Sequence, residues 1–312
     1  MKKAYIILAH KQPELLYRLV EKLDDNQSTF FIHIDKKKSI TDFNKLLDFG
    51  NKVQFIKREA SNWGEIGIVM AILNALKAIK HFNKKIERII LLSGQDYPIK
   101  SNDYINNFLK TSPYSVFIEY WTMPNFKVWK KAGGMFRFNK YFLGLKSSQR
   151  FICKAINFIS IFIPFLRRKL PYNLKPYGGW MWWSIDYYAL NYILQFLEDH
   201  PKYLKYHKYT FVPDEVFFQT ILLNSKDKRL LGSITNNHMR YIQWKDGKSH
   251  PETLTKNDMR AIMTSDALFA RKIDPDLDDE ILNMIDNYID SDNYINIGNS
   301  MNKYDSILTP ML

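Results

Sequence analysis

The chain has 312 residues, of which 46% are hydrophobic and 15% aromatic, and this composition excludes a disordered chain and a low-complexity repeat. Its 45 Lys and Arg residues exceed its 32 Asp and Glu residues, and the formal net charge of +13 suits nucleic acid, an anionic membrane or a phosphorylated substrate. A single cysteine, Cys153, excludes an intramolecular disulfide, and the apolar run near Met1 is too short for a signal peptide, so we expect a cytoplasmic protein.

Strands and helices alternate over the first 120 residues. The apolar pattern predicts, in chain order, a strand at 4–9, a helix at 15–23, strands at 30–34 and 53–56, a helix at 66–79, a strand at 89–92, a helix at 102–109 and a strand at 116–118. This order indicates an α/β fold with a mostly parallel sheet covered by helices on both faces.

Polar residues follow several of these strands, at the edge where ligands bind in such sheets. They are His10, Asp35, Trp63 with Gly64, and the run 93–96 that ends in Asp96. Neither a glycine-rich dinucleotide fingerprint nor a phosphate-binding GxxxxGK is present, which disfavours an NAD enzyme and a P-loop NTPase.

The second half of the chain begins with a loosely patterned aromatic and basic region over 121–176. Its apolar stretch 151–166 falls short of the ~20 residues that span a bilayer. The pattern then predicts a strand at 178–183, helices from Asp186 to about Leu197 and from Pro213, and an acidic helix over 274–292. We see no linker rich in Pro, Gly or Ser, and expect one domain over 1–312.

Pro213 is followed by two carboxylates, Asp214 and Glu215, at the predicted start of a helix. Side chains in a first helical turn project into the cleft that the helix faces, which is a suitable place for a catalytic base. The alternative is that both carboxylates only complement the positive end of the helix dipole.

Six segments together resemble the core-2/I-branching β-1,6-N-acetylglucosaminyltransferases and peptide O-xylosyltransferases of glycosyltransferase family 14. In chain order they are ILAHK at 7–11, HIDKK at 33–37, NWG at 62–64, LSGQDYPIK at 92–100, PDE at 213–215 and FARK at 269–272. The resemblance covers residues 4 to about 275. Because the sequence lacks the membrane anchor and the cysteine set of the animal enzymes, it resembles a compact bacterial member.

The resemblance implies a GT-A type fold, a UDP-sugar donor and inversion at the anomeric carbon without a divalent metal or another cofactor. N-acetylglucosamine is the sugar that we expect. The implied division places the nucleotide-sugar half at about 1–120, the acceptor and catalytic half at about 121–275, and a C-terminal helix and tail at 276–312.

The resemblance also implies roles for single residues. Glu215 matches the catalytic base, and we expect its helical turn to favour the ionised form. Asp35 matches a position that binds uracil. The full set of expected donor-binding residues is His10, Asp35, Trp63, Gly64, Asp96, Arg240, Arg271 and Lys272, and Glu119 and Trp180 are expected to line the acceptor groove.

Each role has a structural alternative. Asp35 could cap its loop, His10 could be a satisfied histidine, and Trp63 and Trp180 could be core residues. Asp96 could stabilise the turn into Tyr97, and the three cations could be solvated. The string Asp274-Pro275-Asp276 resembles a metal-binding Asp-x-Asp only in its letters.

The expected partners are a UDP-sugar and a glycan or lipid-linked oligosaccharide acceptor, with no nucleic acid. The stretch 151–166, followed by Arg167, Arg168 and Lys169, fits either a helix lying on an anionic membrane or a buried helix with a basic turn. The first alternative would place the protein at the inner face of the cytoplasmic membrane. The competing functions are a xylosyl- or other hexosyltransferase and a non-catalytic protein that binds nucleic acid or acidic polysaccharide.

Overall fold

The computed structural model describes residues 1–82, 85–245 and 250–291, and these form two compact units. The first unit contains Met1–Lys11, Gln27–Ser93 and Pro113–His238. The second contains Gln12–Asn26, Gly94–Ser112 and the chain from Met239 onward. The units therefore cross the boundaries expected near residues 120 and 275, and the functional division into halves stays a prediction.

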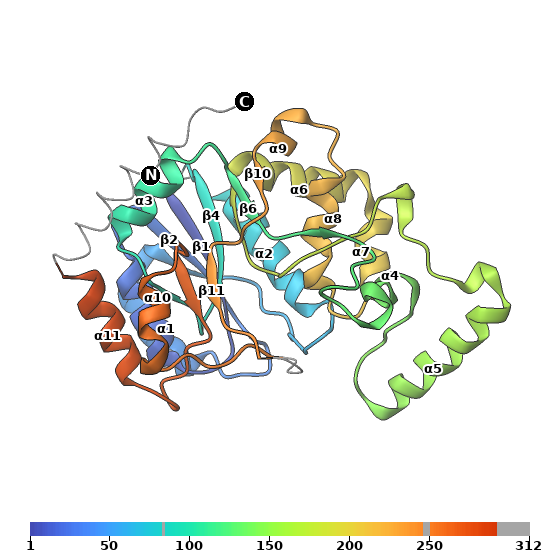
Figure 1. Cartoon of the computed structure of the whole chain (residues 1–312), viewed down its shortest axis with the longest axis horizontal. Helices are drawn as coiled ribbons and strands as arrows, with labels where there is room; N and C mark the ends of the chain where they lie inside the picture. Colours follow the sequence, from blue (N-terminus) through green and yellow to red (C-terminus); the bar gives the residue numbers. More distant parts are fainter. Residues whose placement is uncertain (83–84, 246–249, 292–312) are drawn as a thin grey trace. The chain divides into compact units, whose positions relative to one another are not determined.

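The first unit is built on a seven-stranded sheet with the order β10-β6-β9-β4-β1-β2-β3 (Figure 1). Its strands are β1 (Lys3–Ala9), β2 (Ser28–Ile34), β3 (Val53–Phe55), β4 (Arg88–Ser93), β6 (Val116–Ile118), β9 (Trp183–Asp186) and β10 (Ile234–Thr235). All neighbours pair in parallel except β9, which is antiparallel to both β4 and β6. This sheet, flanked by helices, confirms the predicted α/β class.

The predicted strands of the first 120 residues are confirmed to within two residues at each end. All seven residues of β2 are buried, and a strand covered on both faces has a continuous apolar sequence. The predicted helices are also confirmed, as α1 (Pro13–Leu23), α2 (Gly67–His81) and α3 (Asn102–Thr111).

The other helices of the first unit are α4 (Phe136–Asn139), α5 (Ser147–Phe162), α6 (Tyr187–Asp199), α7 (Pro201–His207), α8 (Phe217–Leu223) and α9 (Lys228–Gly232). The predicted strand at 178–183 is wrong. A two-stranded sheet of β7 (Trp121–Thr122) and β8 (Tyr177–Gly178) ends at Gly178, and β9 begins only at Trp183. Gly179 lies so close to the backbone of Glu119 that a Cβ there would come within 1.9 Å of the Glu119 carbonyl oxygen, and the chain leaves the strand at this contact.

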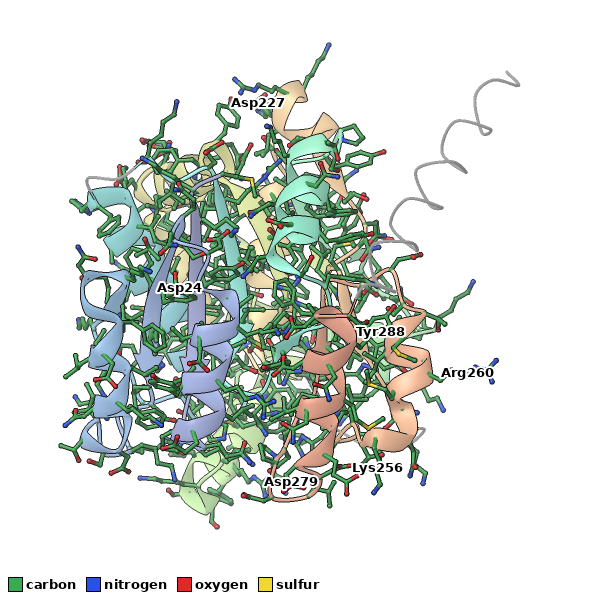
Figure 2. The ribbon with its side chains drawn as sticks, turned by 90° about the vertical axis from the view of Figure 1, so that its left-hand side faces the viewer. Asp24, Asp227, Lys256, Arg260, Asp279 and Tyr288 are labelled. Atoms are coloured by element: carbon green, nitrogen blue, oxygen red, sulfur yellow. The ribbon has the colours of Figure 1, made fainter. Side chains whose placement is uncertain are left out.

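The second unit contains a three-stranded sheet, with the order β11-β12-β5, formed by β5 (Tyr97–Pro98), β11 (Arg240–Ile242) and β12 (Phe269–Arg271). Its helices are α1, α3, α10 (Met259–Met263) and α11 (Glu280–Ile289). Figure 2 shows α10 and α11 side by side, with Arg260 projecting outward and Asp279 at the start of α11. The predicted acidic helix is therefore shorter than 274–292, and residue 292 lies outside the described residues.

Ion pairs join α1 to α11 within the second unit. Arg18 lies 2.7 Å and Lys22 3.1 Å from the carboxylate of Asp286, which also accepts a hydrogen bond of 3.0 Å from the Tyr97 hydroxyl. These groups line a cavity of about 350 Å³ in the same unit. Because its cations already face a shared carboxylate, we interpret this cavity as part of the packing between the helices.

Helix α5 corrects the expectations for the stretch 151–166. It ends at Phe162, just before Pro164, and only Cys153 and Ser160 among its residues are buried. The alternative of a buried helix is therefore wrong. Within residues 1–82, 85–245 and 250–291, no helix combines the length and the apolarity needed to cross a bilayer.

Candidate active site

Glu215 ends a short, constrained turn in the first unit. Val212 has φ 50°, a conformation that is unusual for a β-branched residue, and its N–H donates to the carbonyl of Gly64 over 2.9 Å. Residues Pro213–Glu215 then form a 3₁₀ turn, and α8 begins only at Phe217. Glu215 therefore lies before the helix and not in its first turn, which corrects the sequence prediction. Backbone strain of this kind is concentrated at functional sites.

Arg137 of α4 is the partner of Glu215. Its Nη2 donates to a Glu215 carboxylate oxygen over 2.6 Å, and the Glu215 side chain remains 19% exposed. The guanidinium of Arg137 also stacks on Trp129, 3.7 Å from the ring centroid. A buried arginine thus fixes the direction of a carboxylate that still reaches the surface.

Burial raises the pKa of Glu215 to about 7, while Arg137 lowers it and Asp214 raises it further. Burial likewise raises the pKa of Asp214 to about 6. The expectation that the helix start would favour ionised Glu215 is wrong, because Glu215 lies ahead of α8 and the loss of water around its carboxylate dominates its pKa. A carboxylate with a pKa near 7 is well suited to act as a general base at neutral pH.

Tryptophan rings adjoin the Arg137 side chain. Trp121 meets Trp129, on which Arg137 stacks, and also Trp180, both edge to face, with ring centroids 5.1 and 5.6 Å apart. The carbonyl of Trp180 accepts a hydrogen bond from the Gln219 side chain over 2.7 Å. Trp180 lies between β8 and β9 and is partly exposed, so the alternative of a core residue in a strand is wrong. Aromatic faces suit the apolar faces of sugar rings.

Glu119 is connected to Glu215 through the backbone of Gly179. The N–H of Gly179 donates to the Glu215 carbonyl over 2.8 Å, and Gly179 packs against the Glu119 carbonyl. The Glu119 carboxylate is partly exposed and lies 3.0 Å from Nε2 of His238. The structure therefore brings the expected base and both expected acceptor residues into one region of the first unit.

Asp35 follows β2 and is buried. One carboxylate oxygen accepts the N–H of Lys37 over 2.9 Å, and Arg58 donates to the Asp35 carbonyl over 2.8 Å. The loop-capping alternative is therefore realised in the structure. Binding of uracil by the same carboxylate stays a prediction.

His10 is exposed at the end of β1, and Trp63 is half-exposed. The Trp63 and Phe211 rings meet edge to face, with centroids 5.2 Å apart, and because Trp63 is half-exposed the alternative of a core residue is wrong. A Cβ on Gly64 would come within 2.9 Å of Phe211, and Gly64 has φ 78°, a conformation that glycine favours. Gly64 therefore supports the turn that carries Glu215 through its hydrogen bond to Val212.

The four remaining expected donor residues lie in the second unit. Asp96 is fully buried, and its carboxylate lies 3.5 Å from Nε of Arg271. Burial lowers the pKa of the Arg271 guanidinium, and Asp96 opposes this effect. Gln95 adds two contacts to Ile273, accepting its N–H over 2.9 Å and donating to its carbonyl over 3.2 Å. Asp96 thus holds the segment that carries Arg271.

Arg240 and Arg271 lie on the same face of the three-stranded sheet. Arg240 pairs in register with Phe269, two residues before Arg271, and side chains two residues apart share a face. Arg240 is buried with its guanidinium 4.8 Å from the Phe269 ring centroid, so the alternative of a solvated cation is wrong for this residue. Lys272 follows directly and is partly exposed.

Asp274 and Asp276 are the two carboxylates of the Asp-x-Asp string. Both accept hydrogen bonds from the side-chain amide of Gln12. Within the described part of the chain, no group of three His, Cys, Asp or Glu side chains could hold a metal ion. Metal independence itself stays a prediction.

The family model named Core-2/I-Branching enzyme matches residues 3–266. The chain belongs to the core-2/I-branching enzyme family. Its relatives include the Drosophila melanogaster xylosyltransferase oxt, 25% identical over 74% of this chain and 25% of the relative. The Arabidopsis thaliana β-glucuronosyltransferase GlcAT14A is 28% identical over 62% of this chain and 42% of the relative. Xylosyltransferase 1 of Canis lupus familiaris is 21% identical over 92% of this chain and 30% of the relative.

This core-2/I-branching family member covers from 25% to 42% of the length of these relatives. The family is the one that the sequence predicted, and it is a family of glycosyltransferases.

Two residues of this family member were missing from the predicted site. Arg137 lies 78 positions from Glu215 in a region without clear periodicity, so no local signal connected the two. His238, the partner of Glu119, lies far from it along the chain, so no local signal connected these two residues either. The aromatic and basic region 121–176 offers no signal that separates Arg137 from the other cations of the region.

Proposed function

We propose that the chain is an inverting glycosyltransferase that moves a sugar from UDP to a hydroxyl of a glycan acceptor. Glu215 takes the proton of the acceptor hydroxyl, whose oxygen forms the new bond to the anomeric carbon. The bond from that carbon to the UDP oxygen breaks on the opposite face of the sugar, and UDP leaves with the electron pair. Each step is balanced without a further reactant.

The observation that carries this proposal is the Arg137–Glu215 pair beside the tryptophans. With a pKa of about 7, Glu215 is ionised in a large part of the molecules at neutral pH and can also hold the transferred proton. A module that only binds anions would gain nothing from a partly exposed carboxylate held in one direction. The acceptor sugar would contact Trp180 and Glu119, which lie in the same region.

The diphosphate is the other centre of charge in the reaction. We propose that Arg271, Lys272 and Arg240 neutralise it, arginine through its planar fork and lysine as a point charge. Uracil would bind through Asp35 with His10 and Trp63 beside it.

We expect UDP binding and transfer to survive excess EDTA, while Lys272→Ala weakens UDP binding roughly 10- to 100-fold, the usual value of a charge-assisted contact. Isothermal titration with UDP measures this effect. Lys256→Ala, which removes an exposed lysine that pairs with Glu280, is the control in the same unit. Activity that EDTA abolishes and Mn²⁺ restores would contradict the metal-free proposal, as would unchanged UDP affinity in Lys272→Ala.

N-acetylglucosamine is our first proposal for the transferred sugar. The names of the relatives favour xylose or glucuronic acid as second candidates. Release of UDP from each of the three UDP-sugars distinguishes them, and slow hydrolysis by water suffices for the test because no acceptor is needed. UDP should also raise the melting temperature of the protein while RNA does not. The reverse result would favour the non-catalytic basic protein.

A further inference from the structure

The segment between Glu119 and Asp186 has an unusual charge pattern. It contains twelve Lys and Arg residues and no Asp or Glu. Arg137 and Arg168 are buried in the first unit. The other ten cations are exposed; they are Lys127, Lys130, Lys131, Lys140, Lys146, Arg150, Lys154, Arg167, Lys169 and Lys175. This segment therefore presents a surface with a single sign of charge, and α5 lies at its centre.

Helix α5 is attached to its unit by its polar side. The N–H of Leu143 donates to Sγ of Cys153 over 3.1 Å. The side-chain amide of Asn157 accepts the N–H of Tyr141 over 2.7 Å and donates to its carbonyl over 2.9 Å. Ser160, one turn further along the same side, is buried. These contacts fix which side of the helix faces inward.

The opposite side of α5 is apolar and faces solvent. Phe151, Phe158 and Phe162 lie on it at helical spacing and are 73%, 62% and 70% exposed. We define the α5 apolar face by six exposed residues of the helix and one in the turn after it, namely Phe151, Ile152, Phe158, Ile159, Ile161, Phe162 and, in the turn, Phe165. A helix on the surface of a water-soluble domain normally has the opposite orientation. Figure 1 shows α5 standing away from the sheet of its unit.

Cations lie on and beside this face. Lys154 shares the outward side with Phe151 and Phe158, and Lys146 and Arg150 flank the amino-terminal end of the helix. An exposed apolar face bordered by basic residues matches a helix that lies in the interface of an anionic bilayer.

We propose that the α5 apolar face docks on an anionic lipid surface, with its phenylalanines at the boundary of the acyl chains and the cations against the headgroups. This inference goes beyond the proposed function and does not depend on it. A second copy of the chain is disfavoured as the occupant, because two such faces would bring cations together without an acidic residue of the segment to neutralise them.

The cations that take part differ from the triplet 167–169 suggested by the sequence. Arg168 is buried and donates to the carbonyls of Tyr206 and Tyr209, each over 2.8 Å, so it stabilises the fold. Arg167 donates to the carbonyls of Ser160 and Ile161 at the end of α5. Lys146, Arg150 and Lys154 are therefore the residues to test.

The test is flotation of the full chain with vesicles of phosphatidylglycerol or phosphatidylcholine at low salt. We expect binding to phosphatidylglycerol alone. The triple change Lys146→Gln, Arg150→Gln and Lys154→Gln should weaken it on the order of 100-fold, since each cation near anionic lipid contributes roughly a factor of five. Phe151→Ser with Phe158→Ser and Phe162→Ser should weaken it at least about tenfold.

Matched controls use exposed residues of the same unit outside the segment. Lys202→Gln with Lys226→Gln and Lys228→Gln removes three cations, and Leu231→Ser removes an exposed apolar side chain of α9. Both controls should float like the parental chain, and every variant should keep its affinity for UDP.

Parental protein that stays with the soluble fraction, or a phenylalanine variant that floats as well as the parent, would overturn the proposal. So would a dimer that the phenylalanine changes convert to a monomer without any effect of vesicles. UDP-sugar hydrolysis in solution is measured on the same samples, and its failure would bear on the proposed function only.

Discussion

Glu215→Gln should retain UDP affinity and lose sugar transfer by roughly 10²- to 10⁴-fold, the usual contribution of a positioned general base. Glutamine keeps the size of the side chain and can still meet Arg137 through its amide oxygen, but it cannot take the proton of the acceptor. Steady-state transfer and UDP titration, measured on one preparation, separate the two effects.

The control for this variant is Glu87→Gln. Glu87 is an exposed carboxylate just before β4, at the amino end of the strand, where the family motifs place no residue. Glu87→Gln should change neither sugar transfer nor UDP affinity. Transfer by Glu215→Gln at near the parental rate would show that another group is the base.

Arg137→Gln should lower transfer at pH 7 roughly 5- to 50-fold and move the rise of activity to higher pH. Arg137 lowers the pKa of Glu215, so its loss favours the protonated form that cannot act as a base. A charge-assisted hydrogen bond contributes about 1.5 to 3 kcal/mol, and the ionised fraction should fall correspondingly. The measurement is the pH profile of kcat/KM.

Two further variants test the direction in which the pH profile of activity shifts. In the parental protein, activity should rise with pH through about 7, because the base must be deprotonated. Asp214→Asn should move that rise to lower pH, since Asp214 raises the pKa of Glu215. Arg137→Lys should lie between parent and Arg137→Gln. A profile that Arg137→Gln leaves unmoved would contradict the assigned role of the pair.

The sheet and the break in the chain at Pro213 were predictable from the sequence because their signals are local. Strands such as β2 are buried on both faces and leave a continuous apolar run, and Pro213 marks the turn that carries Glu215. The protonation of Glu215 was not predictable, because it depends on burial and on Arg137, which no spacing rule connects to it. Glu215 also lies ahead of α8 and not in its first turn, where the sequence predicted it.

Helix α5 shows a different limit. The pattern of apolar residues correctly predicted a helix, but an apolar stripe is the same whether it faces a core or a bilayer. The inward side is decided by hydrogen bonds of Asn157 and Cys153 to the backbone of Tyr141 and Leu143. Similarly, the aromatic run at 178–183 is typical of a strand, but the structure interrupts it between Gly178 and Trp183, where Gly179 packs against the backbone of Glu119.

Our proposed function is transfer of sugar from UDP with Glu215 as the base. The most direct measurement is UDP release from UDP-N-acetylglucosamine, UDP-xylose and UDP-glucuronic acid by the parental protein and Glu215→Gln, both in EDTA. We predict release from at least one donor by the parental protein and a loss of roughly 10²-fold or more in the variant. Equal UDP release by the two proteins would contradict the role of Glu215 as the base. No release from any donor by a parental protein that binds UDP would contradict the proposed sugar transfer.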